Sequence, residues 1–67
     1  MENNIFGKNL RYLRLANKMT QKELAAFMYV NAVTICHWEK GLQEPCLDDV
    51  RKLAQFFNVS CDFLLGM

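Results

Sequence analysis

A capping box, Thr20-Gln-Lys-Glu23, is the sequence feature that most constrains the fold of this chain. The Thr20 hydroxyl can accept a hydrogen bond from the backbone amide of Glu23, and the Glu23 carboxylate can reach back to the amide of Thr20. This pattern predicts a helix over residues 21–28. Asn31 offers another N-cap directly afterwards, so the sequence predicts two short helices joined by a tight turn.

Apolar residues at three- and four-residue spacing predict the other helices. The chain has only 3 Gly and 1 Pro, which leaves little turn chemistry for a small sandwich or barrel. The expected fold is therefore all-α, with five helices in one domain over residues 1–67. The residues predicted to point inward are Phe6, Leu10 and Leu13 in a helix over 5–16, Leu24, Ala25 and Met28 in the helix over 21–28, Ile35 and Trp38 in a helix over 32–39, and Val50, Leu53, Ala54 and Phe57 in a fourth helix. A short last helix, capped by Ser60, carries Phe63 and Leu64.

Length and composition exclude several classes of protein. A chain of 67 residues has no room for a second module or a walled substrate cavity. Its cysteines, Cys36, Cys46 and Cys61, are odd in number and form no Cys-x-x-Cys pair, so neither a disulfide framework nor a closed zinc site is expected. The longest apolar run, residues 24–30, is too short to span a bilayer. We expect a reduced cytoplasmic protein with no membrane segment, metal or cofactor.

Charge is distributed unevenly along the chain. The net charge is +1, but residues 1–40 hold six Lys or Arg against three Glu, whereas residues 41–67 hold two against four Asp or Glu. An anionic partner, if there is one, should therefore meet the first half. The single histidine has no partnered nucleophile or carboxylate pair, so no enzyme activity is expected.

Three spaced motifs carry a family resemblance. They are TQKELA, then V-N-A-V-T-I-C-H-W-E-K-G, then P-x-L-D-D-V-x-K-L-A-x-F-F-x-V-S-x-D-F-L-L. In this order they resemble the Cro/CI-type (Xre-like) helix-turn-helix family of bacterial and phage repressors, from about residue 6 to residue 65. The resemblance implies a five-helix, lambda-repressor-like DNA-binding domain with its helix-turn-helix at about residues 20–40.

The same resemblance implies how double-stranded DNA would be bound. The helix over 21–28 would cross the phosphate backbone, and the helix over 32–39 would lie in the major groove. Arg14 and Glu39 would form an ion pair between the first and third helices. The expected phosphate contacts are Thr20, Gln21, Lys22 and Lys40, and the expected base-reading residues, on one exposed side of the third helix, are Asn31, Ala32, Val33 and His37.

This chain departs from the family pattern at several of these positions. Ala32 and Val33 stand where polar or basic side chains are usual, so they can make only apolar contact, best with a thymine methyl group. Tyr29 stands where glycine is usual, and a positive φ would strain it. Glu44 brings an anion into a loop that is commonly basic, which predicts few phosphate contacts and a shallow salt dependence.

Partners other than DNA are also expected. A domain this small needs two copies for adequate affinity, so we expect a homodimer whose interface includes Phe56, Cys61 and Leu65. An alternative remains open, in which the fold serves as an antitoxin-like or anti-regulator subunit. Its protein-binding patch would then be formed by Tyr29, Ala32 and Val33.

Overall fold

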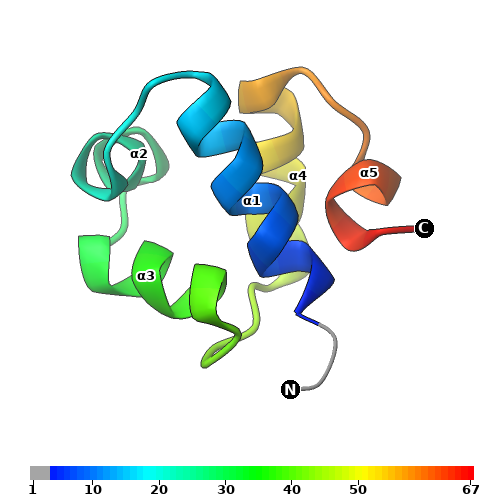
Figure 1. Ribbon diagram of the computed structural model, residues 1–67, viewed down its shortest axis with the longest axis horizontal. Coiled ribbons are helices and arrows are strands. Elements are labelled where there is room, and N and C mark those ends of the chain that lie inside the picture. The colour runs from blue at the N-terminus through cyan, green and yellow to red at the C-terminus, as the bar shows by residue number, and fades with distance from the viewer. Residues whose placement is uncertain (1–3) are drawn as a thin grey trace.

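The computed structural model describes residues 4–67, which form five helices and no strand (Figure 1). The all-α, five-helix prediction is therefore confirmed. Residues 1–3, which the single-domain prediction includes, lie outside the described residues. The helices are α1 (Ile5–Ala16), α2 (Gln21–Met28), α3 (Ala32–Lys40), α4 (Leu47–Phe57) and α5 (Cys61–Leu65).

Local caps set most of the helix boundaries. At the start of α2 the capping box is complete: the Thr20 hydroxyl accepts from the Glu23 amide at 3.0 Å, and the Glu23 carboxylate accepts from the Thr20 amide at 2.8 Å. Helix α3 begins after Asn31 as predicted, but the Asn31 side chain forms no capping hydrogen bond. It also ends at Lys40, one residue later than predicted, and Gly41 follows at a φ of 76°.

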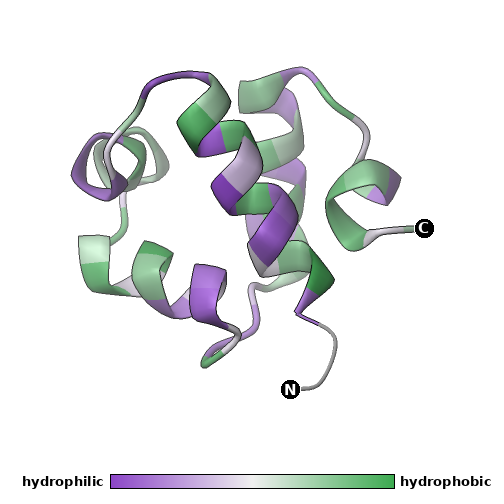
Figure 2. Cartoon of the chain, in the orientation of Figure 1, coloured by the Kyte–Doolittle hydropathy of each residue, from purple (hydrophilic) through white to green (hydrophobic). Residues whose placement is uncertain are grey.

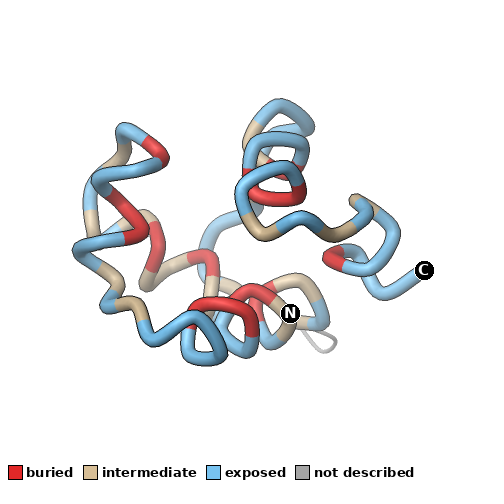
Figure 3. Tube along the Cα trace, turned by 90° about the horizontal axis from the view of Figure 1, so that it is seen from above, coloured by how far each residue is buried: buried red, intermediate tan, exposed pale blue. Residues whose placement is uncertain are grey.

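The core lies where the inner faces of the helices meet, as the buried positions in Figure 3 show. Helix α1 packs against α3 and α5, and α2 packs against α3 and α4. Trp38 of α3 is the largest fully buried side chain. The buried apolar residues are Leu10, Leu13, Leu24, Ala25, Met28, Ile35, Trp38, Val50, Leu53, Ala54 and Leu64.

The close approach of α1 to α3 depends on Gly7. A Cβ atom at this position would lie 2.5 Å from the backbone oxygen of Trp38, far inside van der Waals contact. Asn4 fastens the same two helices, because its side-chain oxygen accepts from the Gly7 amide at 3.1 Å and its Nδ2 donates to the backbone oxygen of Glu39 at 2.7 Å. The start of α1 is thereby tied to the last turn of α3.

We expect Gly7→Ala to lower the free energy of unfolding by about 1–3 kcal/mol, because the added methyl group overfills the contact with Trp38. The sign of this change distinguishes a close contact from ordinary helix propensity, because alanine in an unconstrained helix is more stable than glycine by about 0.5–1 kcal/mol. Urea denaturation followed by circular dichroism measures the change, with the exposed neighbour Lys8→Ala as control. An unchanged or higher free energy for Gly7→Ala would contradict the assigned contact.

Candidate nucleic-acid interface

The outer face of α3 is the surface expected to read bases. Val33 is 60% exposed, and His37 and Lys40 follow it at four and seven residues, the first half-buried and the second exposed. The first two turns of the helix are mainly hydrophobic and its C-terminal end is hydrophilic (Figure 2). The opposite side is buried through Ile35 and Trp38, so α3 presents one face outward and is held by the other.

The N-cap residue Asn31 and the first helical residue, Ala32, differ in exposure. Asn31 is exposed, and its amide forms no capping bond, so it is available to an external partner. Ala32, which is also expected on the exposed side, is only partly exposed, as His37 is, and packs partly against the core. The cause is helical geometry, because successive residues are rotated by about 100° and Ala32 is turned away from the face centred on Val33.

A hydrogen-bonded ion pair holds α3 against α1, where the resemblance places it. Arg14 Nε donates to Glu39 Oε2 at 2.6 Å, and Arg14 Nη2 donates to Glu39 Oε1 at 3.1 Å. The two side chains are only 10% and 5% exposed. Arg14 Nη1 also donates to the backbone oxygen of Met19 at 2.9 Å, so the guanidinium reaches the segment that precedes α2. This two-point geometry restricts rotation as well as distance.

The first turn of α2 completes the candidate interface. Gln21 Nε2 donates to Glu39 Oε1 at 3.1 Å, a contact that sequence patterns did not indicate because the residues are 18 positions apart. Thr20 is engaged in the capping box. Lys22 and Lys40 are exposed and form no ion pair within residues 4–67. The free amides and positive dipole end of a helix N-terminus favour phosphate there.

The residues predicted for a dimer interface line three different hollows. Phe56 lines a hollow between α2 and α4, Cys61 lines a second hollow beside α4, and Leu65 lines a third beside α1. Phe56 also packs its ring against Phe27 of α2, which reduces the surface that it can offer to a second copy. Of the three, Leu65 stands in the most enclosed hollow.

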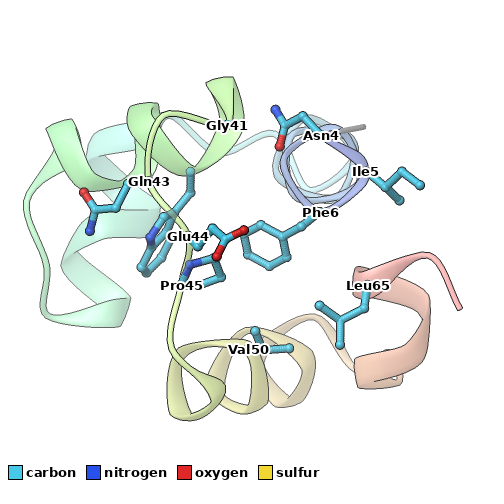
Figure 4. Close-up of a pocket in the computed structure, with 10 residues that line it drawn as sticks. Asn4, Ile5, Phe6, Gly41, Gln43, Glu44, Pro45, Val50 and Leu65 are labelled. Carbon is cyan, nitrogen blue, oxygen red and sulfur yellow. The ribbon is translucent and has the colours of Figure 1, made fainter. Parts of the chain in front are cut away.

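That hollow has a volume of about 310 Å³, and the residue of α3 that lines it is the buried Trp38 (Figure 4). Figure 4 shows Phe6, Pro45 and Leu65 pointing toward the same space from α1, the loop after α3 and α5. Trp38 also lines it, and its indole Nε1 is buried with no hydrogen-bond partner among the described residues. The hollow is thus separate from the face that is expected to read bases.

The described residues offer no metal centre: within residues 4–67, no group of three or more His, Cys, Asp or Glu side chains could hold a metal ion. The cysteines Cys36, Cys46 and Cys61 are free thiols. No helix in this part of the chain is long and apolar enough to cross a membrane.

Comparisons with known proteins agree with this geometry. A family model described as helix-turn-helix matches residues 10–64. The restriction-modification controller protein C.AhdI from Aeromonas hydrophila superimposes with a TM-score of 0.85 at 26% sequence identity, covering 96% of this chain and 98% of that one.

Several transcriptional regulators are similar in sequence. The HTH-type transcriptional activator BcrR of Enterococcus faecalis is 35% identical over 91% of this chain and 30% of its own length. The regulator ImmR of Bacillus subtilis (strain 168) is 35% identical over 90% of this chain and 47% of its own length. The cryptic phage CTXphi transcriptional repressor RstR of Vibrio cholerae is 38% identical over 82% of this chain and 50% of its own length. The chain thus spans half or less of each of these relatives.

We expect Glu39→Ala to lower the free energy of unfolding by about 3–5 kcal/mol, because it leaves the buried Arg14 guanidinium without its carboxylate. Chemical denaturation measures the loss. Glu44→Ala removes an exposed carboxylate and should change the free energy by less than about 0.5 kcal/mol. Equal effects of the two substitutions would show that the pair does not constrain α3.

Tyr29, which stands where the family usually has glycine, has a φ of 58°, and its side chain is 94% exposed. A left-handed conformation costs a non-glycine residue about 1–2 kcal/mol. We therefore expect Tyr29→Gly to be more stable than Tyr29→Ala by about 1 kcal/mol, since both lose the ring and only glycine loses the strain. Thermal and urea unfolding of the two variants provide the measurement; equal stability would place the strain elsewhere.

Proposed function

This chain belongs to the Cro/CI-type (Xre-like) helix-turn-helix family of transcription regulators, and we propose that it represses transcription by binding a palindromic DNA operator as a homodimer. The observation that carries the proposal is the outer face of α3. That face is exposed at Val33 and Lys40, while the other side of the helix is held by Trp38 and by the Glu39 network. A helix held in this way can enter a major groove without distortion of the core.

The proposed base contacts follow from the exposed chemistry of α3. Asn31 has a free amide that can pair with an adenine edge, and His37 can donate to a guanine acceptor. Val33 offers only methyl groups, so its favoured partner is the methyl group of thymine. Ala32, which is half-buried, would contribute through its small size by allowing close approach rather than through a large contact.

The proposed phosphate contacts fall at the two ends of the helix-turn-helix. Lys22 and Lys40 are the exposed cations. Gln21 would act through its backbone amide at the start of α2, and Thr20, whose own amide is bonded to Glu23, would act by fixing that end of the helix. Because Glu44 lies in the loop that follows α3, the number of phosphate contacts should be small. Affinity should then depend only weakly on salt.

A homodimer is proposed on grounds of size. The longest extent of residues 4–67 is 26 Å, shorter than the separation of about 34–36 Å between half-sites one helical turn apart. One copy can therefore occupy only one half-site. Leu65 and Ile5, both partly exposed beside the hollow of Figure 4, support a contact there with a second copy.

Location in the cytoplasm stays a prediction.

The name of RstR supports repression, whereas BcrR is named as an activator. Occupation of an operator by a domain without catalytic groups accounts for repression most simply. We expect that adding the protein lowers run-off transcription from a template that carries its operator, once library selection has identified that operator. A rise in transcription would instead show that the protein is an activator.

Selection from a random duplex library is expected to enrich a palindrome with half-sites about ten base pairs apart and thymines at the Val33 contacts. Replacing such a thymine by uracil removes one methyl group, worth about 0.8 kcal/mol or roughly fourfold in affinity. Val33→Ala should reduce this penalty, which separates a methyl contact from a change in DNA shape.

Removal of Lys22 and Lys40 together provides the control on backbone contacts. Each phosphate contact contributes about 0.9 to the slope of log affinity against log salt, and the double alanine variant removes two contacts from each protomer of the homodimer, so the salt dependence should become shallower by roughly 3.6. Lys8→Ala with Arg11→Ala changes the charge equally on α1, outside the proposed face, and should leave the slope unchanged. A folded protein that enriches no motif would contradict DNA binding as the function.

A further inference from the structure

We propose that α2 and α4 present a docking surface for an acidic, apolar segment of another protein. The surface, here called the aromatic patch, consists of Phe27, Tyr29, Lys52, Gln55 and Phe56. Its rings are continuous across the two helices, because the ring centroids of Phe27 and Phe56 are 4.9 Å apart. The patch lines a shallow, open hollow of about 390 Å³.

The rings of Phe27 and Phe56 lie outside the buried core, and Phe27 is 62% exposed. Tyr29 is almost fully exposed and sits in a left-handed conformation that glycine would adopt without strain. A contiguous group of exposed aromatic side chains is characteristic of a binding surface, whereas single exposed apolar residues are ordinary.

The aromatic patch is also distinct from the proposed DNA face. Phe27 lies in the last turn of α2, whereas phosphate contact is proposed for the first turn. Phe56 lies near the end of α4, a helix that carries none of the proposed DNA contacts. Only Tyr29, in the turn before α3, lies near both surfaces. The two surfaces therefore adjoin only at Tyr29.

Charge identifies the kind of partner. Lys52 is the charged residue of the aromatic patch, and Arg51 lines the neighbouring hollow of about 320 Å³, which shares Gln55 with the first. No Asp or Glu lines either hollow among the described residues, and neither cation forms an ion pair within residues 4–67. Residues 41–67 as a whole carry a net charge of −2, so the attraction for an acidic segment is local to these two cations. Two unpaired cations beside apolar rings complement carboxylates on an apolar segment.

The same charges disfavour a second copy of this chain as occupant. A symmetric contact would bring two copies of the same patch together, so Lys52 and Arg51 of both copies would share one interface. Like charges brought together in an interface cost several kcal/mol, whereas carboxylates of a different protein would be attracted. Exposed rings can also stack on unpaired bases, so single-stranded DNA is included as an outcome of the test.

The probe is a synthetic amphipathic helix of sixteen residues, with Phe and Leu on one face and Glu on the other. A matched peptide carries Lys in place of Glu. In a titration without DNA, followed by amide chemical shifts, the acidic peptide should bind at least tenfold more tightly than the basic one. The perturbed amides should centre on Phe27, Lys52 and Phe56.

Substitutions then separate the contributions. Phe27→Ala should weaken binding of the acidic peptide at least tenfold, and Lys52→Glu should remove its advantage over the basic peptide. Tyr12→Ala changes an aromatic residue of α1 that is 64% exposed and outside both hollows, and should have no effect. The unliganded amide spectrum of each variant establishes that it is folded.

Four results would overturn the proposal: no binding, equal affinity for both peptides, tighter binding of oligo(dT) at the same amides, or concentration-dependent self-association that Phe27→Ala abolishes. Because the titration contains no duplex DNA, its failure leaves the proposed operator binding untouched. Conversely, failure to select an operator leaves the peptide result valid.

Discussion

The bidentate ion pair between Arg14 and Glu39 is the interaction on which the arrangement of the helix-turn-helix depends. Glu39 accepts hydrogen bonds from α1 through Arg14 and from α2 through Gln21, so one carboxylate joins three helices. Such a buried pair adds little net stability compared with apolar packing, but it tolerates few geometries. Its main effect here is to restrict how α3 is turned, and therefore which residues face outward.

Much of the fold could be predicted because caps and apolar spacing are local signals. The boundaries of α1 and α2 follow directly from them. The start of α3 lies where Asn31 predicts it, but the capping bond on which that prediction rests does not form. Contacts between distant residues leave no such signal. The bond from Gln21 to Glu39 and the packing of Phe27 on Phe56 depend on how helices are placed in three dimensions, which periodicity does not specify.

In the candidate site, too, some features follow from local sequence signals and others depend on how the helices are placed. The outward position of Val33 follows from its place opposite Ile35 and Trp38, whereas Ala32 lies at the border between two faces and turns toward the core. Helix ends are the least predictable places on a helical wheel, because neighbouring chain segments cover them. The resulting interface presents one exposed aliphatic side chain at the head of α3, which accounts for the expected preference for thymine.

Two-dimensional NMR of the labelled protein, titrated with its selected duplex, tests most directly the claim that one face of the chain binds DNA. The account predicts that the largest amide shifts fall on Asn31, Val33, His37 and Lys40 and on the first turn of α2, while amides around Phe56 and Leu65 change less. Shifts concentrated on the ends of α2 and α4, with the outer face of α3 unaffected, would contradict it.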